Sequence, residues 1–132
     1  MTEPREVLVV DDESVVADAI RLVLGHEGFE VTGVADAESA LRHPALDRCQ
    51  LVICDLMLPG LSGLDALREM RARRPGLPIV MITGYATTAQ EESVLAAGAT
   101  AFLPKPFDAS ELLTLVRRVL SQAAVAREER KP

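Results

Sequence analysis

The chain has 132 residues and a net charge of −6, with 48% hydrophobic and 26% charged residues. This size and balance are typical of one soluble globular domain, and the acidic charge argues against direct binding of nucleic acid, which needs a basic face. No run reaches the roughly 18 apolar residues of a membrane span, and no signal-peptide pattern opens the chain. We therefore expect a cytoplasmic domain without membrane contact.

Short apolar runs alternate with segments of helical period along the chain. The predicted strands are residues 6–10, 29–35, 51–54, 78–82 and 100–103. The predicted helices begin near residues 14, 36, 62, 88 and 108, and the second runs to about residue 46. This alternation predicts an α/β fold with a five-stranded parallel sheet and helices on both faces. We expect one domain over residues 1–122, with residues 123–132 as a polar tail or the start of a linker to an effector domain.

Local signals place the helix ends and faces. The first helix is expected to turn these residues inward: Val15, Val16, Ala19, Leu22 and Val23. The helix starts are predicted from polar residues that can cap a first turn: Asp36, Ser62, Thr88 and Asp108. Four arginines, at positions 68, 71, 73 and 74, fall on or near the C-terminal half of the third helix, where cations suit the helix dipole.

The stretch from Leu51 to Leu58 is apolar except for Asp55. An unbroken run of this kind, followed by Pro59-Gly60, is typical of a strand buried on both faces of a parallel sheet. A carboxylate without a partner is costly in such a place. Asp55 is therefore expected where the strand ends and opens onto a polar site.

Polar side chains follow three other strands at the point where each ends. Asp11 and Asp12 follow the first strand, Thr83 the fourth and Lys105 the fifth. The carboxyl ends of parallel strands form the ligand-binding edge of such a sheet, so these groups are predicted to gather around Asp55. Clustered carboxylates repel unless a cation neutralises them, and Mg²⁺ or Mn²⁺ suits oxygen ligands. A carboxylate beside such an ion can take a phosphoryl group, with Lys105 and Thr83 holding the phosphate oxygens.

Four motifs, in this order and spacing, carry a resemblance to a known family: VLVVDDE (7–13), CDLMLPGLSGLDAL (54–67), PIVMITGYA (78–86) and FLPKPF (102–107). Over about residues 5–120 the sequence resembles a response-regulator receiver domain of bacterial two-component signalling, in the CheY-like superfamily. The resemblance implies a flavodoxin-like, doubly wound (βα)5 fold with strand order 2-1-3-4-5. It also implies that the domain is not an enzyme beyond catalysing its own phosphorylation and dephosphorylation.

The resemblance assigns roles to individual residues. It implies that Asp55 is the phosphoacceptor, and that the metal is held by Asp11, Asp12, Asp55 and the backbone carbonyl of Met57. Thr83 matches the switch hydroxyl and Lys105 the family's lysine, and the Lys105-Pro106 bond matches a position that is usually cis. Phe102 stands at the switch aromatic position, where Tyr is common, and the alternative is that Phe102 is simply a core residue.

The implied partner is a sensor histidine kinase or a phosphotransfer protein. A homodimer through the surface of the fourth helix, fifth strand and fifth helix is also plausible, and the output is expected to be a controlled activity such as transcription. A phosphorylation-independent interaction module remains an alternative, although it usually lacks one of the acids, the Thr or the Lys. An aspartate-nucleophile phosphohydrolase is disfavoured because it carries a second acid where this chain has Met57. No Gly-rich loop follows the first strand, which argues against a nucleotide-binding flavodoxin-like protein.

Overall fold

Strands and helices alternate throughout the computed structural model, which describes residues 5–129. The strands are β1 (Arg5–Val10), β2 (Phe29–Val34), β3 (Leu51–Asp55), β4 (Ile79–Thr83) and β5 (Ala101–Pro104). The helices are α1 (Ser14–His26), α2 (Ala37–Arg42), the short 3-10 helix η1 (Pro44–Asp47), α3 (Gly63–Arg73), α4 (Thr88–Ala96) and α5 (Ala109–Glu129). The predicted alternation is confirmed, and no strand end is shifted by more than one residue.

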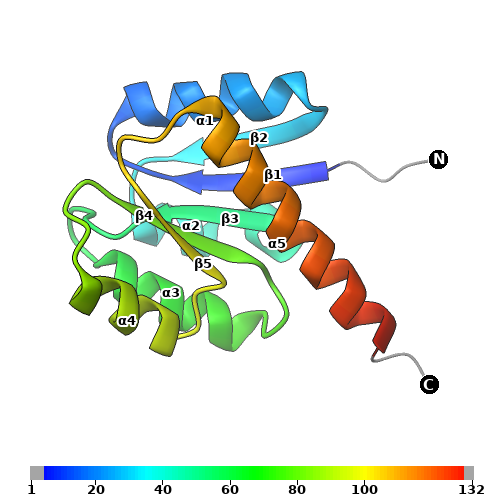
Figure 1. Ribbon diagram of the computed structural model, residues 1–132. Coiled ribbons are helices and arrows are strands. Elements are labelled where there is room, and N and C mark those ends of the chain that lie inside the picture. The colour runs from blue at the N-terminus through cyan, green and yellow to red at the C-terminus, as the bar shows by residue number, and fades with distance from the viewer. Residues whose placement is uncertain (1–4, 130–132) are drawn as a thin grey trace.

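The five strands form one parallel sheet in the order β2-β1-β3-β4-β5 (Figure 1), which confirms the predicted topology. All residues of β3 and β4 are buried, as an apolar run covered on both faces requires. In β1, Val10 pairs with Cys54 of β3, so the residues that follow Val10 come beside Asp55. Strand order alone therefore brings the ends of β1 and β3 together.

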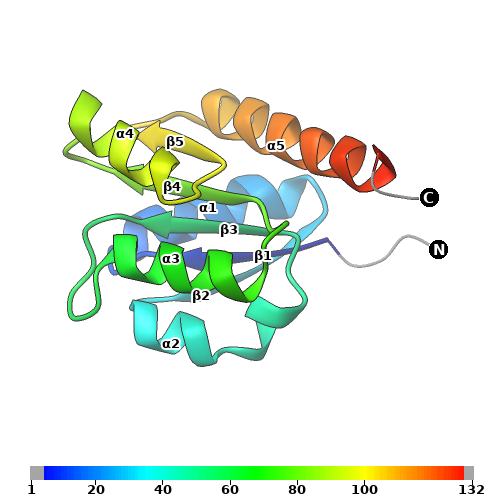
Figure 2. The same ribbon diagram turned by 90° about the horizontal axis from the view of Figure 1, so that it is seen from below.

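Each face of the sheet carries its own apolar core. One core packs α1 and α5 against the sheet, through residues such as Ile20, Leu24 and Val116. The other packs α2, α3 and α4 on the opposite face, through residues such as Ala40 and Met70. Figures 1 and 2 show these helices as two layers around the sheet. The carboxyl edge of the strands stays open between the layers.

The inward face predicted for α1 is only partly right: Val16 and Val23 are half-buried and pack against the core that α1 shares with α5. Val15, Ala19 and Leu22 are exposed, Val15 at 80% and Leu22 at 65%. The helix instead buries Ile20 and Leu24, which lie four residues apart on one stripe. Apolar residues occur on several sides of α1, so the spacing is compatible with more than one buried stripe, and packing on the sheet selects between them.

The second predicted helix is interrupted. α2 ends at Arg42, and Pro44 opens a separate 3-10 helix, because proline has no backbone N–H to continue the helical hydrogen bonds. The imidazole of His43 caps this turn: its Nδ1 accepts the N–H of Ala45 at 3.0 Å. The start of α4 also shifts, since Thr87 rather than Thr88 caps it by accepting the N–H of Gln90.

α5 begins at its predicted cap and runs past residue 122. Its first turn has the predicted cap, in which Asp108 and Glu111 each accept the other's backbone N–H, at 2.8 and 3.2 Å. The helix then continues through Glu129, so residues 123–129 are helical, and their role as a polar tail or the start of a linker stays a prediction. Residues 130–132 of that predicted tail lie outside the described part, and the domain boundary at residue 122 stays a prediction. Between residues 5 and 129, no helix combines the length and apolar character needed to cross a membrane.

Gly63, the first residue of α3, lets that helix start directly against the end of β3. A Cβ at this position would lie 2.3 Å from the carbonyl oxygen of Asp55 and 2.7 Å from the backbone of Leu56. Since these are backbone atoms, no side chain can move aside to make room. The close approach therefore fixes the turn that follows Asp55.

We predict that Gly63→Ala lowers the free energy of unfolding by about 1–3 kcal/mol, the usual cost of overpacking, despite alanine's higher helix propensity. Gly25→Ala is the matched control in α1, because nothing lies within 4 Å of its added Cβ. This control should leave stability unchanged or raise it. Urea unfolding measures both, and a Gly63→Ala variant as stable as the parent would contradict the argument.

Candidate functional site

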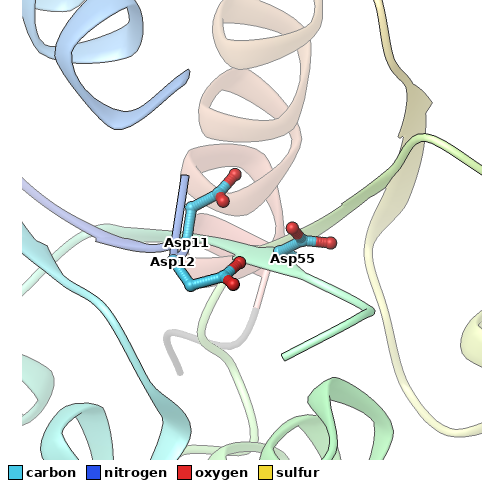
Figure 3. A group of neighbouring side chains, drawn as sticks. All are labelled: Asp11, Asp12 and Asp55. Carbon is cyan, nitrogen blue, oxygen red and sulfur yellow. The ribbon is translucent and has the colours of Figure 1, made fainter. Parts of the chain in front are cut away.

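Three carboxylates meet at the carboxyl edge of the sheet. Asp11 and Asp12 follow β1, and Asp55 ends β3 (Figure 3). One oxygen from each carboxylate lies within 4.8 Å of the others. Asp11 and Asp55 are buried at 3% exposure each, whereas Asp12 is exposed. The structure thus brings together the three acids predicted from the sequence.

Short local turns orient the side chains at three strand ends. Asp11, Asp55 and Thr83 each accept a backbone N–H from two residues further on, donated by Glu13 at 2.8 Å, Met57 at 3.0 Å and Tyr85 at 3.2 Å respectively. Such turns are typical of Asp and Thr because their short side chains reach the backbone just ahead. Each polar group is therefore held in place before any ligand arrives.

Lys105 supplies the positive charge. Its Nζ lies 2.9 Å from Asp55 Oδ2, 3.1 Å from Asp11 Oδ2 and 2.8 Å from Glu13 Oε1. The backbone places it: Lys105 N–H donates to the carbonyl of Thr83 at 2.8 Å, and the Lys105-Pro106 bond is cis, the isomer implied by the resemblance. Burial alone would lower the pKa of Lys105. Its hydrogen bonds to Glu13 and Asp55 and the close carboxylate of Asp11 outweigh burial and raise that pKa above its usual value.

Negative charge still exceeds positive charge in this cluster. Burial raises the pKa of Asp11, and the charge of Asp55 adds to this, against the lowering by the Glu13 N–H and Lys105. Among the described residues, no donor makes a hydrogen bond to Asp11 Oδ2, although Lys105 lies close to it. A buried carboxylate oxygen with a free lone pair, beside two more carboxylates, fits a hard divalent cation.

The two predicted switch residues lie near this cluster without joining it. Thr83 is fully buried, and its hydroxyl is engaged by the N–H of Tyr85. Phe102 lies in β5, half-buried, and packs with the core on the α3 and α4 face.

Met57 follows Asp55 by two residues and is 56% exposed. The role of its carbonyl oxygen as a metal ligand stays a prediction.

A family model decides the identity of the chain. Residues 7–117 match the response regulator receiver domain. The chain belongs to the response-regulator receiver family. This receiver domain is a signalling domain of two-component response regulators, and its five-stranded fold is the one that the resemblance implied.

Individual relatives agree with this assignment. The receiver domain is 36% identical over 123 residues to a probable transcriptional regulatory protein, TcrX, of Mycobacterium tuberculosis, covering 93% of this chain and 53% of TcrX. It is 40% identical over 116 residues to the DNA-binding response regulator MtrA of Mycobacterium bovis, covering 88% of this chain and 50% of MtrA. The chain thus spans about half the length of these curated relatives.

Solved structures show the same fold. A CheY-like receiver domain protein from Methanospirillum hungatei matches with a TM-score of 0.87 and 29% identity, covering 94% of this chain and 99% of that one. NtrX from Brucella abortus matches with a TM-score of 0.88 and 37% identity, covering 96% of this chain and 29% of NtrX.

Sequence reasoning missed one member of the cluster. Glu13 belongs to the quoted VLVVDDE motif, yet the sequence analysis assigned it no role. In the receiver domain its carboxylate contacts Lys105, 92 residues away in the chain. The acidic pair is followed directly by a third acid, which indicates that Glu13 lies near the site. The sequence spacing does not indicate that its ion-pair partner is Lys105.

We predict that Asp11→Asn raises the free energy of unfolding in metal-free buffer near neutral pH. A carboxyl whose pKa is raised by folding destabilises the native state when ionised, and Asn can still accept the N–H of Glu13. The gain should shrink as the pH falls through the raised pKa of Asp11, since protonation then removes the same penalty from the parent. Urea unfolding with a chelator present, across this pH range, measures the effect. A variant less stable than the parent at neutral pH would contradict it.

Proposed function

We propose that Asp55 is the phosphoacceptor of this receiver domain and takes its phosphoryl group from a histidine kinase or a phosphotransfer protein. The observation that carries the proposal is the contact of Asp55 with Lys105 at 2.9 Å, beside two further carboxylates. A lysine beside Asp55, together with neighbouring acids that can hold a divalent cation, suits transfer of an anionic phosphoryl group.

Mg²⁺ or Mn²⁺ would be held by the carboxylates of Asp11, Asp12 and Asp55 and by the carbonyl of Met57. When bound, the ion neutralises charge on the acids and on the incoming phosphate oxygens. The chain's own groups do the rest. An oxygen of Asp55 forms the new bond to phosphorus as the donor's bond to phosphorus breaks, and the ammonium of Lys105 donates to a phosphoryl oxygen.

The new charge would then act on Thr83 and Phe102. The Thr83 hydroxyl, whose oxygen accepts the N–H of Tyr85, would donate its own O–H to a phosphoryl oxygen. Phe102 is half-buried and would then turn further inward. α4 lies beside these residues and buries only Val94, so little core packing opposes its displacement. We propose a population shift in the surface of α4, β5 and α5, rather than a newly created state.

That surface is also where we place the output. A homodimer could form through it, and control of transcription is the output suggested by the relatives TcrX and MtrA, whose names describe regulatory and DNA-binding proteins. With a net charge of −6, the domain itself is not proposed to bind DNA. Enzymatic turnover of free phosphate esters is not proposed either, because Met57 stands where the phosphohydrolases carry their second acid.

We predict that Asp55→Asn abolishes labelling by acetyl phosphate in the presence of Mg²⁺, since the amide cannot attack phosphorus. Phosphate-affinity electrophoresis or intact-mass spectrometry measures the label. Excess chelator should also abolish labelling of the parent chain. Undiminished labelling of Asp55→Asn would reject the assignment of the phosphoacceptor, and labelling that survives the chelator would reject the need for a divalent ion.

We further predict a relatively long-lived phosphorylated form. Hydrolysis needs water in line behind phosphorus, and two large exposed side chains stand at the mouth of the site: Met57 is 56% exposed and Tyr85 74%. Each follows a site residue through one of the short turns, which fixes its backbone beside that residue. Replacing both by Ala should speed loss of the label from isolated, phosphorylated protein. Slower loss in the double variant would contradict this steric argument.

A further inference from the structure

Glu13 is the acid of the cluster to which the proposed reaction gives no role. It is the N-cap residue of α1, yet its side chain makes no capping hydrogen bond. The carboxylate instead crosses to the loop after β5 and lies 2.8 Å from Lys105 Nζ. Glu13 thus contacts a lysine 92 positions away and does not cap its own helix. This choice of partner points to a role for the contact.

The three partners of Lys105 differ sharply in exposure. The side chain of Asp11 is 0% exposed and that of Asp55 4%, whereas that of Glu13 is 61% exposed. An ammonium has three N–H groups, and three carboxylate oxygens lie within 3.1 Å of this one. Losing the lysine would leave either buried carboxylate without its counter-charge, at high cost. Glu13 can exchange the lysine for water at little cost.

We propose that Glu13 is a positioning residue that holds Lys105 in the unphosphorylated state and competes with the phosphoryl group for it. A phosphoryl oxygen that arrives at Asp55 needs an N–H from Lys105, and Glu13 is the partner that yields it. The proposal rests on the proposed phosphoacceptor function of Asp55 and adds to it a restraint set by a residue outside the metal cluster. Glu13 thereby limits both the rate of phosphorylation and the affinity for the phosphoryl group.

The test uses acetyl phosphate at saturating Mg²⁺. The bond between phosphorus and the acetate oxygen breaks as the bond to Asp55 forms, and acetate leaves with the electron pair, so no further reactant is needed. We expect Glu13→Gln to raise the labelling rate about two- to fivefold, the range that corresponds to loss of one exposed ion pair. Affinity for beryllofluoride, a tetrahedral phosphoryl mimic, should rise by a similar factor in an NMR titration. A residue that merely supports the fold would not tighten this complex.

Two variants separate the contact from bulk charge. Glu13→Asp keeps the charge but withdraws the carboxylate by one methylene, so it should behave like Glu13→Gln. Asp18→Asn removes an exposed carboxylate from the same helix, away from Lys105, and should behave like the parent. Thermal melts check that all three variants fold.

The outcomes are distinct. Faster labelling and tighter beryllofluoride binding by both Glu13 variants support the proposal. An effect of Glu13→Gln alone, an equal effect of Asp18→Asn, or unchanged or slower labelling would each overturn it. If the parent chain takes no label on Asp55 at all, the proposed function itself fails. That outcome differs from a failure of the Glu13 proposal, in which the parent chain is labelled but the Glu13 variants are not labelled faster.

Discussion

The rest of the site depends on how one ammonium is shared among carboxylates that the sheet forces together. Because β1 and β3 are neighbours, Asp11 and Asp55 come side by side whatever their charge. Lys105 enters from the end of β5 and must pass β4 to reach them. Its backbone N–H is bound to Thr83 at the end of β4, and its long side chain spans the remaining distance. A shorter cation at this position would leave the two buried acids without a counter-charge.

α4, which belongs to the surface proposed to respond to phosphorylation, is packed more firmly at its C-terminal end than along its length. α4 contributes one buried residue, Val94, to the core. At its C-terminal end, however, Arg71 of α3 binds the carbonyl of Gly98 through Nε and Nη2, at 2.9 and 2.7 Å. The same guanidinium reaches Leu77 at 2.6 Å, so it joins three segments that are separate in the sequence. α4 is therefore fixed beyond its C-terminus and weakly packed along its length.

The fold and most of the site could be predicted from the sequence because both follow from local patterns. An apolar run that ends in a polar residue marks a strand end, and a parallel sheet gathers such ends at one edge. The sequence therefore predicts that Asp11, Asp55 and Lys105 lie together, as they do in the structure. The buried face of α1 is predicted only in part, because its apolar residues permit several stripes and packing on the sheet selects the one with Ile20 and Leu24. The end of α5 is not fixed by the sequence, since a charged helix end and a linker have the same composition.

Contacts between segments that are distant in the chain cannot be predicted from the sequence patterns. The arginines of α3 were interpreted through the helix dipole, yet Arg71, Arg73 and Arg74 bind carbonyls of other segments. Glu13 illustrates the same limit, because its exposure and its cation depend on where the β5–α5 loop lies. Within one ion cluster, burial then separates two kinds of acid. The charge of a buried acid needs a counter-charge inside the site, whereas an exposed acid can be hydrated by water instead. The contact of Lys105 that can be given up at least cost is therefore the exposed one, with Glu13.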